Sequence, residues 1–376
     1  MQSVRSPRAE SHPGPDPLPS TASVLPGERS GLLTWLDEGL RNGRRGRLQA
    51  EYGPLLRDPG ATRHAVADLG GRPIAHAMAR LVDVQAAGVR TPLGMIGLVY
   101  TDPAFRRRGL AARCVGICEG WLAEAGVPLV ALWSDRHDWY ARLGYHLAGV
   151  EVNLLVDASV CARAGSRLPF EGVIRTPQAG DWPALEALHE QKSSRAARRP
   201  GQLRSLASGP DCRVVVARRG SRALAYAALG RGDDFAGIVH DWAGESGAVL
   251  ACLAHLLADR ATLSVLAGPA DGVLETALRS AGADAYEGGF ALVKPLDPAL
   301  LWQRLAPDHT ELARRGEGFR LTGDGGACDL DGRETVRLLL GPGFPEPAGA
   351  AFSPAQRRAL GARLPWPLFV GGFDSV

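Results

Sequence analysis

The stretch that decides the fold is Val99-Tyr100-Thr101-Asp102-Pro103-Ala104-Phe105-Arg106-Arg107-Arg108-Gly109-Leu110-Ala111. An apolar strand runs into an Asp-Pro turn, and a helix begins directly after the signature Arg106-x-x-Gly109-x-Ala111. Gly109 and Ala111 let backbone N–H groups approach a ligand closely, and the first turn of the helix adds unpaired N–H donors and a positive dipole end. The combination predicts a cradle for a diphosphate, although a Gly-x-Ala at such a junction is by itself most often a simple helix cap.

A second segment, downstream of the first, carries a matching signature. It reads Trp133-Ser134-Asp135-Arg136-His137-Asp138-Trp139-Tyr140-Ala141-Arg142-Leu143-Gly144-Tyr145, in which a strand ends in a polar turn and a short helix follows. The run from Pro103 to Ala111 resembles the acyl-CoA pyrophosphate loop of the GNAT acetyltransferases, whose pattern is Arg/Gln-x-x-Gly-x-Gly/Ala. The second segment resembles the Tyr-x-x-Leu/Phe-Gly-Tyr/Phe helix of the same family.

The order of the expected elements extends this resemblance along the chain. Residues 25–157 read as two helices followed by alternating strands and helices, and a similar order restarts after a linker at 165–171. The arrangement is similar to the Eis-type branch of the family, in which tandem GNAT domains precede a sterol-carrier-like domain. It implies a mixed α/β fold of the α+β kind: two tandem GNAT-like domains, each a mixed, mostly antiparallel sheet flanked by helices, plus a short C-terminal segment.

The domain boundaries follow from the same pattern. Residues 1–24 are rich in proline and poor in apolar side chains, so we expect a disordered tail. Residues 25–160 would form the catalytic GNAT domain, 170–296 a degenerate GNAT-like domain, and 297–376 a C-terminal segment interpreted as a sterol-carrier-like remnant. In the second domain residues 243–247 replace the Arg-x-x-Gly-x-Ala loop. We therefore expect that domain to have lost CoA binding and to serve packing, pocket shaping or oligomerisation.

The overall composition excludes several classes of protein. With 376 residues the chain is long enough for two or three domains, and a net charge of +3 with 45% hydrophobic residues is that of an ordinary globular protein. All but two of the 43 basic residues are arginines, which we interpret as a genomic composition bias, so no nucleic-acid partner is expected. The six cysteines include no CxxC pair, and no apolar run approaches the ~18 residues of a membrane helix. We expect no metal, no disulfide scaffold and no membrane partner; the default location is the cytoplasm, and a homo-oligomer is compatible with the sequence.

The resemblance assigns acetyl-CoA, as cosubstrate, to the first domain. The backbone of Val99, Tyr100 and Thr101 would line its pantetheine, with one N–H near the thioester carbonyl as the oxyanion donor. The turn residues Asp135 and Arg136 match positions that flank CoA in the Eis-type pattern. The backbone amides implied to hold the pyrophosphate belong to Arg107, Arg108, Gly109, Leu110, Ala111 and Ala112.

Two residues are the candidate catalytic groups. By the resemblance, Tyr140 matches the tyrosine that protonates the departing CoA thiolate. A free phenol has a pKa of ~10 and a thiol ~8.5, so full transfer is uphill by about 2 kcal/mol and a strong hydrogen bond to the sulfur is the safer role. The tail from Trp366 to Val376 is unusually apolar for an exposed terminus, which predicts that it is buried. Val376 resembles the Eis-type device in which the terminal carboxylate reaches the active site.

The base that deprotonates the amine is left open among Glu51, Asp135, His137 and the carboxylate of Val376. The function implied is an acetyl-CoA-dependent N-acetyltransferase, which moves an acetyl group to a primary amine of a small molecule or peptide by direct attack. The alternative is a non-catalytic acyl-CoA-binding sensor or interaction module, which would lack an acceptor pocket beside the thioester.

Overall fold

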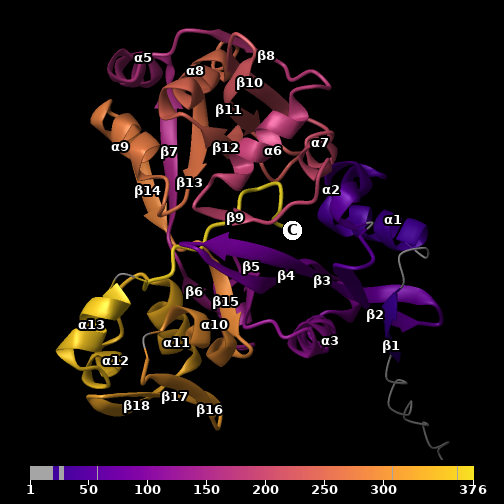
Figure 1. The fold of residues 1–376 in the computed structure, drawn as a ribbon. Coiled ribbons are helices and arrows are strands. Elements are labelled where there is room, and N and C mark those ends of the chain that lie inside the picture. The colour runs from indigo at the N-terminus through magenta and orange to yellow at the C-terminus, as the bar shows by residue number, and fades with distance from the viewer. Residues whose placement is uncertain (1–19, 25–28, 57, 307, 362) are drawn as a thin grey trace, which may run out of the picture.

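Two mixed β-sheets form the two halves of the molecule, above and below the centre of Figure 1. The computed structural model describes residues 20–24, 29–56, 58–306, 308–361 and 363–376. The first sheet has eight strands and the second has seven, and helices flank both. This architecture confirms the expected tandem fold, with the C-terminal segment as a smaller third lobe.

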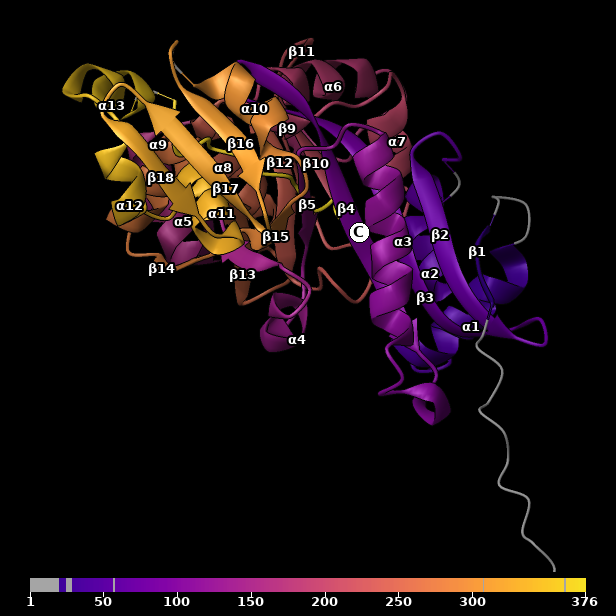
Figure 2. The ribbon, with the colours of Figure 1, turned by 90° about the horizontal axis from the view of Figure 1, so that it is seen from below.

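The first sheet has the strand order β1-β2-β3-β4-β5-β15-β6, and β9 pairs with β3. Helix α3 (Leu110–Glu124) lies along one face, as Figure 2 shows, and buries Cys114 and Cys118 against it. The helices α1 (Arg29–Leu40) and α2 (Arg47–Leu56) cover the opposite face, where they pack against Met78 and Val66 of the sheet. The strands are β1 (Ser20–Val24), β2 (Thr62–Leu69), β3 (Arg72–Ala86), β4 (Val89–Thr101), β5 (Leu129–Leu132), β6 (His146–Ala148), β9 (Ser194–Ala196) and β15 (Ala291–Pro295).

The N-terminal boundary differs from the expectation. Residues 20–24, expected to belong to the disordered tail, pair antiparallel with β2 as strand β1. The rest of the expected tail, residues 1–19, lies outside the described residues.

The second sheet has the order β14-β7-β13-β12-β11-β10-β8. Helix α8 (Ser246–Leu256) packs on one face together with α5 (Ala158–Arg167) and α9 (Gly272–Ser280). The other face is covered by α6 (Trp182–Glu190) and α7 (Gln202–Leu206), and α7 also contacts α2. The strands are β7 (Glu151–Asp157), β8 (Val173–Arg175), β10 (Arg213–Arg219), β11 (Arg222–Leu229), β12 (Ile238–Gly244), β13 (Thr262–Ala267) and β14 (Asp284–Gly288).

The two halves exchange strands: β7 lies in the second sheet, and β9 and β15 of the second half lie in the first. The chain turns at Gly149, whose φ of 75° suits glycine best, so β6 stays in the first sheet while β7 joins the second. In return β15, from the end of the second half, inserts between β5 and β6. Neither sheet is therefore complete without the other half of the chain.

The C-terminal lobe is a three-stranded antiparallel sheet with helices on it, seen beside the main body in Figures 1 and 2. Its core includes the stacked rings of Trp302 and Phe352, with centroids 6.2 Å apart. The interpretation of this lobe as a sterol-carrier-like remnant stays a prediction. Its elements are α10 (Pro298–Leu305), β16 (Glu311–Arg315), β17 (Gly318–Gly323), β18 (Gly326–Leu330), α11 (Gly332–Leu340), α12 (Glu346–Ala350) and α13 (Pro354–Gly361).

The C-terminal tail leaves this lobe and ends in the middle of the molecule, between the two sheets (Figure 1). The indole N–H of Trp366 donates to the Ala86 carbonyl at 2.8 Å, and Ser194 accepts from the backbone N–H of Phe369 at 2.8 Å. Phe373 is fully buried. The tail is therefore buried, as its apolar composition predicts.

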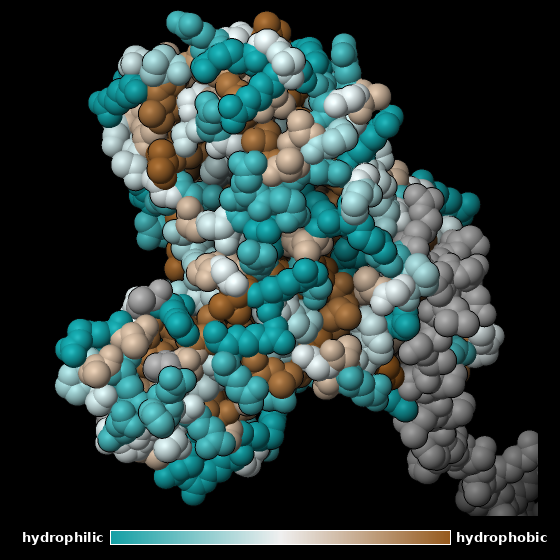
Figure 3. Space-filling model, viewed as in Figure 1, coloured by the Kyte–Doolittle hydropathy of each residue, from teal (hydrophilic) through white to brown (hydrophobic). Residues whose placement is uncertain are grey.

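The surface in Figure 3 mixes polar and apolar side chains on the face that is shown. Within the described part of the chain, no helix is long and apolar enough to cross a bilayer. The same residues contain no group of three His, Cys, Asp or Glu side chains that could hold a metal ion.

Candidate active site

Strand β4 bends away from β5 and opens the first sheet. The two strands pair in parallel over only two residue pairs, the second of which is Met95–Ala131. A bulge then places Leu98 at a φ of 49°, in the left-handed region that leucine rarely adopts. His76 holds this bulge, because its Nδ1–H donates to the Leu98 carbonyl at 2.7 Å. Burial lowers the pKa of His76 to about 4, so the ring is neutral and its Nε2 can accept from His64 at 3.0 Å.

A cavity of about 600 Å³ follows the opened edge of β4 to the N-terminus of α3. Arg108 and Asp135, predicted to bind the cofactor, do not line it: the Arg108 guanidinium lies over the Phe105 ring at 5.4 Å, and Asp135 is exposed. The sequence prediction did not include Trp139, which does line the cavity. The predicted residues that line it are Val99, Tyr100, Thr101, Arg107, Gly109, Leu110, Ala111, Ala112 and Arg136.

The geometry of this cavity fits a ligand that carries a diphosphate. Gly109 is the N-cap of α3 with a φ of 75°, and no heavy atom lies within 4 Å of the place where its Cβ would be. Among the described residues, no side chain caps this helix, so its first N–H groups and the positive end of its dipole both face open space. The Thr101 hydroxyl is buried and has no hydrogen-bond partner among the described residues. Together with the nearby Arg106 and Arg107, these donors suit the CoA moiety of an acyl-CoA.

A second cavity, of about 510 Å³, lies between the two sheets. Its walls come from β4, from Asp234 and Phe235 of the second half, and from the C-terminal tail. The carboxyl carbon of Val376 lies 2.8 Å from the place where a Cβ on Gly97 would be, so only a glycine lets the tail come this close to β4. The terminal carboxylate therefore stands at the wall of this cavity.

The two cavities meet at four shared residues, which are Leu40, Val99, Ser134 and Tyr140. Tyr140, on α4 (His137–Ala141), is almost fully buried and makes edge-on contacts with the rings of Trp139 and Tyr145. Burial raises the pKa of Tyr140 to about 12. Against a thiol of pKa ~8.5, full proton transfer is then uphill by roughly 5 kcal/mol. The phenol stays protonated and can donate a hydrogen bond at the junction.

The four candidate bases lie in different surroundings. Val376 lines the second cavity, whereas Glu51, Asp135 and His137 line neither cavity. Glu51 is buried, and its carboxylate accepts from Arg41 Nε at 2.7 Å. It also pairs with Arg47 at 2.6 Å, so protonation of Glu51 would weaken two ion pairs, and the residue is better suited to structure than to proton transfer. Asp135 and His137 are exposed.

Sequence reasoning missed Glu151, the first residue of β7, which lines the second cavity. Burial raises the pKa of Glu151 to about 7. Asp234 adds a further carboxylate to the cavity and is paired with Arg41 at 2.6 Å. The sequence signal for this residue was a glutamate at the start of a strand with alternating apolar side chains. The strand exchange that brings Glu151 to the cavity depends on distant contacts, so no neighbouring residues predict it.

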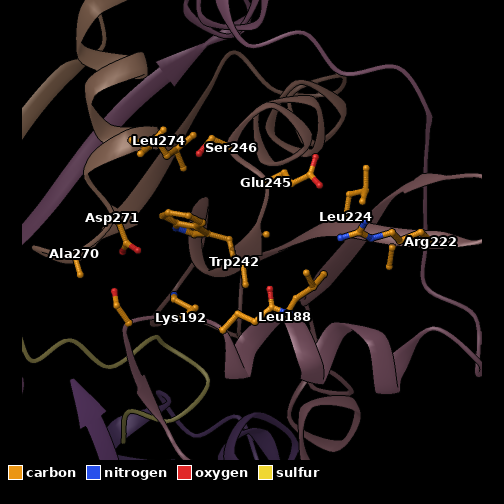
Figure 4. A pocket seen from close by; sticks show the side chains of 16 residues that line it. Leu188, Lys192, Arg222, Leu224, Trp242, Glu245, Ser246, Ala270, Asp271 and Leu274 are labelled. Carbon is orange, nitrogen blue, oxygen red and sulfur yellow. The ribbon is translucent and has the colours of Figure 1, made fainter. Parts of the chain in front are cut away.

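A third cavity, of about 400 Å³, lies at the end of β12 and the start of α8, where the second half repeats the β4–α3 junction (Figure 4). Figure 4 shows the Trp242 side chain in its middle, between Asp271 and Leu224. Glu245 is the N-cap of α8, at the place that Gly109 takes before α3. A carboxylate at this helix end opposes a bound diphosphate.

Comparisons with known proteins agree with this geometry. The family model described as Acetyltransferase (GNAT) family matches residues 30–145. A GCN5-related N-acetyltransferase from Anabaena variabilis is 13% identical with a TM-score of 0.70, covering 95% of this chain and 100% of that chain. Eis1 from Mycobacterium abscessus is 19% identical with a TM-score of 0.61, covering 95% of this chain and 100% of that chain.

A third solved structure, a GCN5-related N-acetyltransferase from Kribbella flavida, is 17% identical with a TM-score of 0.64, covering 96% of this chain and 99% of that chain. A search of the curated proteins returns no match. Residues 30–145 therefore match the GNAT acetyltransferase family model, and the chain as a whole shares the fold of these solved structures, Eis1 among them.

Proposed function

We propose that the protein is an acetyl-CoA-dependent N-acetyltransferase that acetylates a primary amine by direct attack. The observation that carries this proposal is the junction of the two cavities at Tyr140. A thioester whose CoA part lies in the 600 Å³ cavity would present its carbonyl at this junction, facing the 510 Å³ cavity. An amine in the second cavity would then meet the carbonyl without a covalent enzyme intermediate.

The residues proposed to hold acetyl-CoA are the amides of the Gly109 loop for the pyrophosphate and the free edge of β4 for the pantetheine. A backbone N–H near Val99, where β4 no longer pairs with β5, would donate to the oxyanion that develops on the thioester carbonyl. Thr101 contributes its unpartnered hydroxyl to the same cavity. The cosubstrate itself supplies the activated acyl group.

The second cavity is proposed to bind the acceptor and to take its proton. Arg41 neutralises Asp234 in this cavity, and the remaining carboxylates, those of Val376 and Glu151, favour a small molecule or peptide that carries a protonated amine. Loss of one proton to a carboxylate or to a water beside it makes the amine nucleophilic. As the C–N bond forms and the C–S bond breaks, the departing thiolate accepts a hydrogen bond from the Tyr140 phenol.

The alternative function, a non-catalytic acyl-CoA sensor, predicts that no acceptor space adjoins the thioester. The 510 Å³ cavity beside Tyr140 favours the enzyme instead.

The experiment that tests the proposal measures release of CoA thiol from acetyl-CoA in the presence of amines of different classes. The panel includes aminoglycosides, polyamines and peptides with free N-termini. Thiol release that depends on one amine class, with mass spectrometry showing one acetyl group gained on nitrogen, is the expected result. Tight acetyl-CoA binding with no amine-dependent release across the panel would favour the sensor.

A further inference from the structure

The second half repeats the opening of β4 and β5 but fills it with the chain itself. β12 and β13 pair in parallel over only two residue pairs, and a bulge against β11 follows at His240. The same arrangement opens the cofactor cavity in the first half. Here the Trp242 indole N–H donates to the Leu266 carbonyl at 2.9 Å and ties the diverging strands together.

The C-terminal tail lies against the bulged part of β12. The Gly372 N–H donates to the His240 carbonyl at 3.0 Å. A Cβ on Gly371 would stand 3.1 Å from that same carbonyl oxygen, so a larger residue would push the tail away. Phe369 and Phe373, both almost fully buried, anchor the tail before and after this contact. The tail thus occupies the strand edge that corresponds to the proposed pantetheine edge of the first half.

A buried charge network fixes the tail beside this edge. Arg198 donates from Nε and Nη2 to one oxygen of Asp374, at 3.0 and 2.6 Å, and also binds Asp241. The Tyr226 hydroxyl donates to the other Asp241 oxygen at 2.6 Å. The three charged side chains are at most 2% exposed. Loss of Arg198 would leave two buried carboxylates without their shared cation, and loss of the Asp374 charge would remove the ion pair that ties the tail to Arg198 and Asp241.

A second buried cation, Arg231, holds the last residues of the chain. It donates to the carbonyl of Gly372 and, at 3.2 Å, to that of Ser375. Its guanidinium lies over the Tyr52 ring at 4.1 Å, which fixes the arginine in turn. These contacts hold the residue before Val376 and leave the terminal carboxylate against β4.

We propose that this edge of β12 is a binding site for the chain's own C-terminal peptide, and that Arg198 and Asp241 are positioning residues that act through Asp374 on the terminal carboxylate. The inference rests on the proposed function, in which the carboxylate of Val376 contacts the acceptor amine. Arg198, Asp241 and Asp374 do not line the acceptor cavity, so their effect on the reaction must pass through the tail.

The substitution Asp374→Asn tests this site, because it removes the charge and keeps the shape of the side chain. With the full-length protein, kcat for the responsive amine should fall about ten-fold or more, while the Kd for acetyl-CoA stays within about two-fold. Amide hydrogens of residues 369–376 should exchange faster, which reports tail release independently of activity.

A double-mutant cycle separates this role from a general structural one. In a chain extended by Gly-Ser-Gly after Val376 the carboxylate is already displaced, so Asp374→Asn should lower kcat no further. If the extension alone leaves kcat unchanged, the carboxylate has no part in the proposed function. If the extension slows the reaction but Asp374→Asn changes neither kcat nor exchange, or if the two losses multiply, the positioning role is overturned.

Asp181→Asn is the matched control, since Asp181 is a buried carboxylate of the same half that binds Arg175 at 2.6 Å and also pairs with Arg218. It should lower the melting temperature and leave kcat unchanged. Should Asp374→Asn fail to fold, Arg198→Lys keeps the charge but loses the planar fork. A fall in kcat with faster tail exchange is expected there, and unchanged values of both would overturn the proposal.

Discussion

The two halves of the molecule share a strand, a turn and a helix around an opened sheet, but they fill the opening differently. In the first half, the turn before α3 ends in Gly109 and exposes N–H donors beside arginines. In the second half, Glu245 is the residue before α8. There, Trp242 and the C-terminal tail bridge the gap between β12 and β13. The fold therefore supplies an opening in each half, whereas a few residues at its mouth decide whether a ligand or the chain itself enters.

The largest expected effect comes from making the first half resemble the second at its turn. Gly109→Glu would place a carboxylate and a Cβ in the open space before α3. Acetyl-CoA affinity, measured by calorimetry, should weaken by at least about 100-fold, because the charge opposes the pyrophosphate and the side chain blocks its approach.

A matched control exists in the second half. Gly201 is also a helix N-cap in the left-handed region, with a φ of 78° and nothing within 4 Å of its Cβ position. Gly201→Glu should carry a similar backbone strain of about 1 kcal/mol and leave cofactor binding intact. Two acetyl-CoA molecules bound per wild-type chain would mean that the second half still binds the cofactor and that the two halves do not differ in this respect.

Displacing the terminal carboxylate should have the next largest effect. A Gly-Ser-Gly extension keeps Phe369 and Phe373 as anchors but moves the charge away from Gly97. We expect kcat to fall about 100-fold with a normal melting temperature and normal acetyl-CoA affinity. Deleting Val376 instead recesses the charge and enlarges the cavity, so slow turnover in both variants identifies the carboxylate's position as the cause. Slow turnover in the extended chain alone would indicate a blocked cavity.

Tyr140→Phe should lower kcat by about 100-fold with little change in acetyl-CoA affinity, because only the hydrogen bond to the leaving sulfur is lost. Tyr145→Phe is the control. Its hydroxyl lies close by in the same core but bonds Glu119 at 2.8 Å, so its loss should cost about 1 kcal/mol of stability and no activity. Turnover within about two-fold of wild type in Tyr140→Phe would make Tyr140 a packing residue.

Much of the fold and of the cofactor cavity could be predicted from the sequence because the signals are local. The Asp-Pro turn, Gly109 and the start of α3 are neighbours in the chain, and Tyr140 follows on the next strand–helix unit. Glycine conformation, strand periodicity and helix onset act over such short distances.

The features that could not be predicted depend on contacts between residues far apart in sequence. Arg198 and Asp374 are 176 positions apart, and β15 enters the first sheet from the end of the second half. Glu51 shows the same limit, since glutamate is a residue type that is mostly exposed, but the distant pairing with Arg41 lets Glu51 be buried. A single sequence marks neither the partner nor the register of such pairs.

The smallest expected effect concerns Glu151, which the strand exchange brings to the wall of the acceptor cavity. Its pKa is about 7 in the folded protein, against ~4.3 in an unfolded chain. The folded state therefore holds this proton more tightly, and the unfolding free energy falls as pH rises between these values, with the full penalty present above about pH 7. Glu151→Gln removes the penalty, so denaturant titrations should show the variant gaining about 1–2 kcal/mol over wild type between pH 5 and pH 8, after allowance for partial exposure.

If the Glu151 carboxylate also receives the amine's proton, kcat/KM of the wild type rises with pH through about 7, and this rise is lost in the Glu151→Gln variant. A stability difference that does not vary with pH would mean that Glu151 ionises like an exposed carboxylate and that the exchange of strands creates no unusual site there.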